Sequence, residues 1–232
     1  MTQPTLQELK ERFDTDDSLP LSQGNNPVFG EGPHNAKILA IGEAPGFHED
    51  QQKRPFIGRS GQLLRKLLVE SGIDLQNDIY ITNIVKHRPP ENRDPTPEEI
   101  EAYREYLDLQ LQLIKPEIII TLGRFSMNKF IPNAKISLIH GQAHWVTIDN
   151  KKTMLLPMYH PAAALRGTTV MNIFKQDFAK LKSALDYFNE LGSIESFSDS
   201  DNSDENNAET TTNTTKTKET KKPKQTQLPL IT

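Results

Sequence analysis

The sequence contains no cysteine among its 232 residues. This absence excludes disulfides, a thiol nucleophile and a metal cluster held by thiolates. Long apolar runs are also missing, since no segment approaches the ~18 consecutive apolar residues that a membrane-spanning helix needs. The first residues lack the basic stretch followed by an apolar one that is typical of a secretory leader. We therefore expect a cytoplasmic protein without a membrane segment.

A large excess of charge of one sign is also absent. The formal net charge is −4 at pH 7, with 27 Lys and Arg against 31 Asp and Glu. Net charge therefore gives no reason to expect nucleic-acid binding, which would have to depend on a local basic patch. The sequence has such a patch at Lys86, His87, Arg88 and Arg93.

Apolar residues become scarce from Ser193 onward. So few of them cannot compensate for the entropy lost when a chain becomes ordered. We therefore predict a folded domain at 1–192 and a disordered linker at 193–226. The linker is segregated by charge, with acidic residues in its first half and lysines in its second. Apolar residues return in the last segment, 227–232.

The folded part alternates between apolar runs that are typical of buried strands and segments with helical spacing. This alternation indicates a mostly parallel sheet covered on both faces. We predict an α/β fold, specifically a three-layer α/β/α sandwich around a four-stranded sheet. The expected strands are 36–42, 78–85, 117–123 and 153–160, and the expected helices are 5–13, 61–72, 96–115 (opened by a capping box at Thr96), 125–130 and 170–191.

Each predicted strand ends in polar, glycine or proline residues. The segments are GEAPG after the first strand, TNIVKHRPPENR at the end of the second, LG after the third and YHPAAALRG after the fourth. In parallel α/β sheets, ligands bind beyond the carboxyl ends of the strands. The four segments therefore predict one binding site at that edge of the sheet.

Four residues near this edge could bind a ligand or do chemistry. Glu43 follows a buried strand, Phe56 lies between two sharp bends, Asn83 interrupts an apolar strand, and His160 precedes a proline at a strand end. Taken singly, each also has an ordinary structural explanation, such as a solvated turn, a core aromatic or a satisfied amide. An amide offers both a donor and an acceptor, so Asn83 could also read the edge of a base.

Together, the motifs resemble those of the uracil-DNA glycosylase superfamily, and most closely its family-4 branch of bacterial and archaeal enzymes. The segments GEAPG, PFIGRSGQLL, NIVKHRPPENRDPTPEE, TLG and YHPAAALR occur in this order between about residues 28 and 185. Each motif alone is weak evidence for this family, whereas five motifs in this order are specific to it. The resemblance implies an enzyme that flips deoxyuridine out of DNA and hydrolyses its N-glycosidic bond, leaving uracil and an abasic site.

The resemblance also implies a role for each matched residue. Glu43 would position or activate the attacking water, and His160 would donate a hydrogen bond to the base oxygen that gains negative charge. Phe56 would stack on the flipped base, and Asn83 would pair with the uracil edge and reject cytosine. The base pocket would be completed by the backbone of Gly42, Ala44 and Gly46, and the DNA contacts would come from Lys86, Arg88, Leu165 and Arg166.

The chain departs from this branch in one respect. Family-4 enzymes typically hold a four-iron four-sulfur cluster with four cysteines, and the corresponding positions here fall near Thr15, Ser18, His87 and Tyr103. Such side chains do not replace thiolate ligands, so we expect no cofactor and no metal. A related branch traps DNA covalently through a histidine on an inserted loop. The segment around His87 shows no insertion, so we expect multiple turnover.

The sequence leaves two other functions open. One is a non-catalytic module that binds damaged DNA, and the other is a glycosylase for another deaminated base such as hypoxanthine. The end of the chain adds a candidate partner, because it resembles the pentapeptide with which bacterial repair proteins dock on the sliding clamp, although a chance apolar terminus fits equally well. The residues concerned are Gln227, Leu228, Leu230 and Ile231. We expect a monomer whose linker would hold the domain near the clamp.

Overall fold

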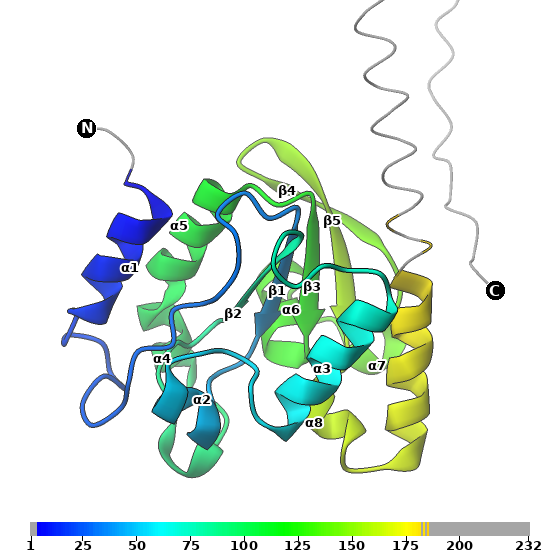
Figure 1. The fold of residues 1–232 in the computed structure, drawn as a ribbon, viewed down its shortest axis with the longest axis horizontal. Coiled ribbons are helices and arrows are strands. Elements are labelled where there is room, and N and C mark those ends of the chain that lie inside the picture. Colours follow the sequence, from blue (N-terminus) through cyan, green and yellow to red (C-terminus); the bar gives the residue numbers. More distant parts are fainter. Residues whose placement is uncertain (1–3, 182, 184, 186–232) are drawn as a thin grey trace, which may run out of the picture. The chain divides into compact units, whose positions relative to one another are not determined.

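A five-stranded sheet forms the centre of the fold (Figure 1). The computed structural model describes residues 4–181, 183 and 185. The chain divides into two units, 1–182 and 183–232, and the five strands of the described residues belong to the first. The predicted domain boundary at 192, the linker and the segment at 227–232 lie outside the described residues.

The strands follow the order β2–β1–β3–β5–β4 across the sheet. The first four are parallel, so their carboxyl ends lie along one edge, where the predicted ligand-binding segments begin. Gly42 at the end of β1 pairs in register with Asn83 at the end of β2. The bounds are β1 (Ile38–Gly42), β2 (Ile79–Asn83), β3 (Ile118–Leu122) and β5 (Lys151–Met158).

The α/β/α class is confirmed, but the predicted number of four strands is wrong. A fifth strand, β4 (His144–Ile148), pairs antiparallel with β5 at the edge of the sheet. A two-residue turn joins the two strands, and its residues Asp149 and Asn150 have φ angles of 49° and 64°. Asp and Asn tolerate this left-handed conformation, which tight hairpins require. The Asp-Asn pair is therefore the sequence signal for the hairpin.

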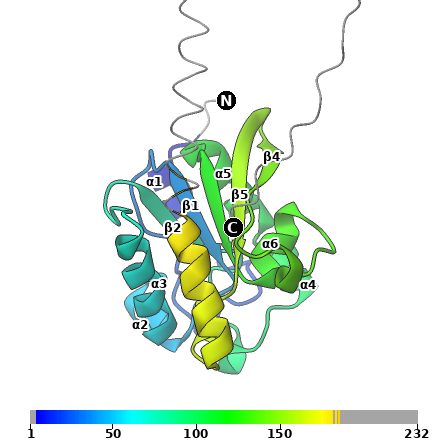
Figure 2. The ribbon, with the colours of Figure 1, turned by 90° about the vertical axis from the view of Figure 1, so that its right-hand side faces the viewer.

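Helices cover both faces of the sheet (Figure 1). On one face, α1 (Leu6–Asp14) and α5 (Arg104–Ile114) bury apolar side chains in a core that includes Leu39, Ile41 and Ile119. On the other face, α3 (Arg59–Glu70) lies beside the helix at 168–181 (Figure 2). The hydroxyl of Ser71 joins these two helices, since it donates to the carbonyl of Phe178 at 2.9 Å.

The helix predicted at 96–115 is divided at Tyr103 into two helices. The predicted capping box is present, with reciprocal hydrogen bonds between Thr96 and Glu99. The remaining helices are α2 (Phe47–Gln52), α4 (Pro97–Ala102), α6 (Arg124–Phe130), α7 (Ile136–Ile139) and α8 (Pro161–Ala164). Three short helices, α2, α7 and α8, escaped prediction because segments of four to six residues show no clear periodicity. Within the described part of the chain, no helix has the length and apolar character to cross a membrane.

Candidate active site

A cavity of about 600 Å³ lies at the carboxyl ends of the parallel strands. Residues from all four predicted strand-end segments line it, which brings together side chains that are distant in the sequence. Those predicted as site residues and found in its walls are Glu43, Ala44, Gly46, Phe56, Asn83, His160 and Arg166. Gly42 lies directly beneath, in contact distance of two of these side chains.

Glu43 is the first residue after β1. Its backbone carbonyl accepts the N–H of Val85 at 3.0 Å, which ties the loop after β1 to the loop after β2. Burial, and then the negative charge of Asp94, raise the pKa of Glu43 to about 7, although Arg124 and Arg166 oppose the change. A carboxyl group with a pKa near neutrality can accept and release a proton at physiological pH, as a general base must.

His160 is the N-cap residue of α8. Its Nδ1 accepts the backbone N–H of Ala162 at 3.2 Å. Burial, and then the positive charge of Arg166, lower the pKa of His160 to about 4, so the imidazole is neutral at pH 7. A neutral imidazole carries one proton, and an accepting Nδ1 leaves that proton on Nε2. His160 can therefore donate a hydrogen bond from Nε2 to a ligand in the cavity.

Asn83 ends β2 with only 1% of its surface exposed. Its Oδ1 has no hydrogen-bond partner among the described residues. A buried polar atom without a partner costs about 1–3 kcal/mol, so this oxygen indicates a ligand that brings a donor. A Cβ atom at Gly42 would lie 2.3 Å from Oδ1 of Asn83 and 2.4 Å from Cζ of Phe56. Only glycine at position 42 leaves room for both side chains.

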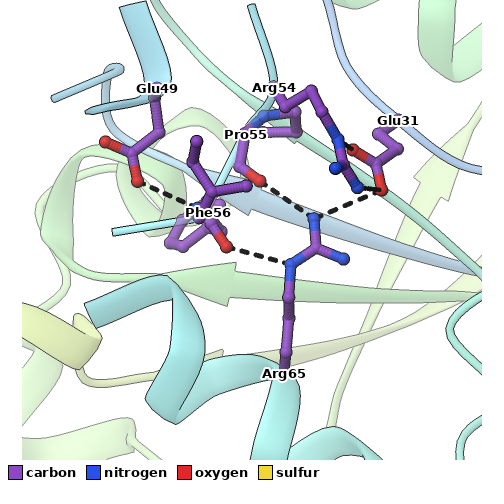
Figure 3. A network of polar contacts seen from close by, with 7 residues as sticks. Glu31, Glu49, Arg54, Pro55, Phe56 and Arg65 are labelled. Carbon is purple, nitrogen blue, oxygen red and sulfur yellow. Dashed lines mark hydrogen bonds and ion pairs between the residues drawn. The ribbon is translucent and has the colours of Figure 1, made fainter. Parts of the chain in front are cut away.

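The ring of Phe56 lies against Gly42 at the end of β1, with its centroid 6.1 Å from that of His160. Its φ angle of 52° is uncommon for a residue with a side chain. Such a conformation persists only where the surroundings impose it. Two side chains impose it: Nε of Arg65 donates to the carbonyl of Phe56 at 2.9 Å (Figure 3), and Glu49 accepts from the next two backbone N–H groups.

The same network joins the Phe56 loop to the sheet. Arg65 also donates to the carbonyl of Pro55 at 3.0 Å and reaches Glu31 at 3.4 Å. Glu31 accepts two hydrogen bonds from Arg54, at 2.7 and 2.8 Å, and exchanges backbone hydrogen bonds with Ile81 of β2. Sequence reasoning did not assign Glu31, Glu49 or Arg65 to the site, because none of them follows a strand end.

The predicted contact between Lys86 and DNA is wrong. This side chain is fully buried, and its ammonium donates to Oγ1 of Thr82 at 2.8 Å, to the carbonyl of Asn83 at 3.0 Å and to Oε1 of Gln110 at 2.6 Å. Burial lowers the pKa of Lys86 well below its ordinary value. The side chain has no surface to offer a phosphate, and instead it supports the backbone of Asn83 from within the protein.

The other three residues predicted to contact DNA lie around the mouth of the cavity. Arg166 lines it, and the neighbouring Leu165 is 40% exposed. Arg88 donates to Oδ1 of Asn92, which is also part of the cavity wall. Sequence reasoning missed Arg124, which lines the cavity and forms an ion pair with Asp94.

The positions that correspond to cluster-binding cysteines do not fit an iron–sulfur cluster. Nδ1 of His87 lies 2.8 Å from the hydroxyl of Tyr103, and both side chains are buried. The hydroxyl of Thr15 donates to backbone carbonyls within α1, and that of Ser18 bonds to Asp16. These groups already have partners, and none is a thiolate. In the described ranges, no group of three or more His, Cys, Asp or Glu side chains could hold a metal ion.

Comparisons with known proteins agree with this geometry. The model of the Uracil DNA glycosylase superfamily matches residues 29–186. Type-4 uracil-DNA glycosylases of Sulfurisphaera tokodaii, Saccharolobus solfataricus and Archaeoglobus fulgidus are 41%, 42% and 42% identical to this chain. These matches cover 70%, 69% and 67% of this chain and 80%, 76% and 80% of the three relatives. The chain belongs to the uracil DNA glycosylase superfamily.

Proposed function

We propose that this protein excises uracil from DNA as a step of base-excision repair. It takes up a deoxyuridine flipped out of the strand and hydrolyses the N-glycosidic bond, which releases uracil and leaves an abasic site. The observation that carries this proposal is the unpartnered Oδ1 of Asn83, which is buried in a cavity shared with Glu43 and His160. The type-4 uracil-DNA glycosylases at about 40% identity support the same activity.

The amide of Asn83 suits the edge of uracil. Uracil presents a donor at N3 and an acceptor at O4, so Oδ1 can accept from the first and Nδ2 can donate to the second. Cytosine has an acceptor at N3 and an amine at C4, which leaves both amide groups facing groups of their own kind. The ring of Phe56, whose Cζ would lie 2.4 Å from a Cβ atom at Gly42, stacks on the flipped base.

Glu43 and His160 act on the two charges that develop as the bond breaks. The sugar becomes positive and the departing base becomes negative. The oxygen of a water molecule bonds to C1′ as the bond between C1′ and N1 breaks, and the carboxylate of Glu43 takes the proton from that water. The uracil leaves with the bonding electrons, and Nε2–H of His160 donates a hydrogen bond to O2, where the negative charge gathers.

These roles are performed by side chains of the chain itself. An iron–sulfur cluster would find no thiolate here, so we infer that the enzyme works without one. Leu165 and Arg166, at the mouth of the cavity, are proposed to fill the gap left by the flipped nucleotide and to hold its phosphates. That the protein is a cytoplasmic monomer stays a prediction.

Cleavage of a labelled oligonucleotide with a single uracil, followed by alkali, tests this function. We expect strand breaks from the wild type and a loss of at least a hundredfold in rate for Asn83→Ala and Glu43→Gln. We expect no loss for Asn77→Ala, an exposed asparagine whose side chain bonds to Asp74. Specific binding to the uracil strand without breaks would instead support a non-catalytic module. Breaks at hypoxanthine but not at uracil would assign a different base.

The C-terminal segment is proposed to bind a sliding clamp of the bacterial type. The segment holds Gln227, Leu228, Leu230 and Ile231 at the end of a polar linker, and a tether of this kind raises the local concentration of an enzyme near its substrate. Deletion of residues 227–232 should abolish clamp binding and leave excision on short oligonucleotides intact. Equal clamp affinity for the full and shortened chains would contradict the proposal.

A further inference from the structure

Phe47 exposes an aromatic ring beside the mouth of the cavity. It is the first residue of α2, and 51% of its surface is exposed, whereas aromatic side chains of folded proteins are largely buried on average. It directly follows Gly46, which lines the cavity. The ring therefore lies next to the place where a DNA strand must pass for its uracil to enter.

Arg88 holds this ring from one side. The central carbon of its guanidinium lies 5.1 Å from the centroid of the Phe47 ring, a cation–π arrangement. Its Nε donates to Oδ1 of Asn92 at 2.8 Å, so the guanidinium is fixed to the rim of the cavity. Two segments that follow different strands thus build one pair, with one face of the ring covered by a positive charge and much of the ring open to solvent.

The charged and apolar side chains around Phe47 and Arg88 favour a nucleic-acid strand as the ligand of this pair. Arg93, Arg124 and Arg166 all line the cavity, and the side chains of the first two are 42% and 61% exposed. Arginines attract phosphates, and an exposed aromatic ring among them offers a surface on which a base can stack. Leu165, at another point of the mouth, supplies a second exposed apolar side chain.

We propose that Phe47 and Arg88 form a stacking platform for the base next to the flipped uracil. This inference rests on the proposed function, because the uracil must occupy the cavity for its neighbour to reach Phe47. Removal of the uracil from the stack deprives the adjacent base of one stacking partner, and the ring of Phe47 replaces that partner. The platform suits single-stranded DNA best, because an unpaired base can turn onto the ring without losing a complementary base.

A fluorescent base tests this directly. 2-Aminopurine is placed on the 5′ or the 3′ side of a uracil whose sugar carries a 2′-fluorine, which slows cleavage, in single-stranded and duplex oligonucleotides. We expect the wild type to quench the fluorescence at one flank only. Phe47→Ala should lose that quenching and bind the single strand roughly tenfold more weakly, whereas Phe47→Trp should keep both properties.

Val69→Ala is the matched control, because Val69 is an apolar side chain of α3 that is 57% exposed and does not line the cavity. It should behave as the wild type. If Phe47→Ala binds and quenches like this control while the wild type releases uracil, the platform is refuted and the glycosylase function stands. The platform is also refuted if Phe47→Ala binds DNA more weakly than the wild type but quenches 2-aminopurine to the same extent as the wild type at each flank. A wild type that releases no uracil from unmodified DNA contradicts the proposed function itself.

Discussion

Burial moves the two titratable groups of the cavity toward their uncharged forms. It raises the pKa of Glu43 to about 7 and lowers that of His160 to about 4. The imidazole is therefore neutral throughout the physiological range, while the carboxyl group changes its charge within that range. A neutral donor beside a titrating base is the combination that the proposed hydrolysis needs.

The pH dependence of uracil excision should follow Glu43. Because the carboxylate is the active form and its pKa is about 7, kcat/KM should fall as the pH drops below 7, approaching tenfold per pH unit. The measurement is kcat/KM between pH 5 and 9 at constant ionic strength, since DNA binding depends on salt. Activity that stays constant from pH 5 to 8 would contradict the assignment of Glu43 as the base.

Asp94→Asn offers a matched test of the same group. The negative charge of Asp94 raises the pKa of Glu43. Asp94 also pairs with Arg124, whose positive charge lowers the pKa of Glu43. Neutralisation of Asp94 should therefore shift the acid limb of the kcat/KM profile to lower pH. A limb that stays in place would contradict a contribution of Asp94 to the pKa of Glu43.

Lys86 should prove to be a positioning residue. Lys86→Met removes the donor to the carbonyl of Asn83 and leaves Oε1 of Gln110 without that partner, at a cost of about 2 kcal/mol in the free energy of unfolding. The single-turnover rate on saturating uracil DNA should fall at least tenfold as the amide of Asn83 moves. Urea unfolding and rapid-quench kinetics check both effects, with the exposed Lys66→Met as control. A folded variant with the wild-type rate would leave Lys86 with a structural role only.

The sequence allowed Glu43, Asn83 and His160 to be found because each lies at or just beyond the carboxyl end of a strand in a parallel sheet, where position alone predicts the site. It could not reveal the surroundings of Lys86, which resembles an exposed basic residue until Thr82 and Gln110 are placed around it. The contacts of a side chain come from elements that are distant in the sequence, so burial of a charged group escapes a local pattern.

At the scale of elements, the first turn of α3 is shaped by the loop that carries Phe56. A Cβ atom at Gly61 would lie 2.0 Å from the backbone carbonyl carbon of Phe56 and 2.1 Å from its oxygen. Backbone atoms cannot give way as a flexible side chain can. The start of the helix and the Phe56 loop can therefore approach each other only if residue 61 is glycine.

Gly61→Ala should consequently destabilise the protein, although alanine is favoured over glycine in a helix by about 1 kcal/mol. We expect a loss of about 2 kcal/mol or more in unfolding free energy, together with weaker uracil binding as Phe56 is displaced. Thermal unfolding and excision kinetics check this against Gly167→Ala, where a Cβ atom would meet nothing within 4 Å in the described part of the chain. Equal stability of the two variants would mean that the loop adapts freely.

The layers of the sandwich could be predicted from the sequence, because apolar runs and helical spacing are local patterns. The hairpin of β4 and β5 escaped prediction because its local signal, the Asp149-Asn150 pair, lacks the more familiar glycine. The division of the helix at Tyr103 had no local signal, since its apolar spacing continues through the break. We attribute this division to packing against other elements.

At the scale of the whole molecule, an aromatic cluster joins α1 to the sheet. The ring of Phe13 lies 5.1 Å from that of His87 and 4.9 Å from that of Tyr106, and His87 bonds to Tyr103. The cluster thus connects α1, the loop after β2 and the start of α5. It includes two of the positions at which the resemblance places cluster ligands, and it supplies apolar packing there.

Stability should decline in mild acid because of His87. Burial lowers the pKa of this imidazole to about 4, below its ordinary value of 6.5, so the unfolded chain binds a proton between these pH values that the folded chain does not. Stability is therefore lost as the pH falls through this window. Urea unfolding at pH 7 and pH 4.5 should show a decline about 2 kcal/mol larger for the wild type than for His87→Phe. Equal declines would show that His87 is protonated as easily in the folded protein.

The same cluster predicts how the whole protein responds to iron and to its removal. The chain has no cysteine, and His87 and Tyr103 are already bonded to each other, so the contact between α1 and the sheet offers no thiolate to an iron–sulfur cluster. Protein purified from iron-rich medium should lack stoichiometric iron, and its melting temperature and excision rate should be the same with and without a strong chelator. Tyr103→Phe, which leaves Nδ1 of His87 unpaired, should lower the unfolding free energy by about 1 kcal/mol without a chelator. A melting temperature that drops in chelator and returns with iron would show that a metal, and not the aromatic cluster, joins α1 to the sheet.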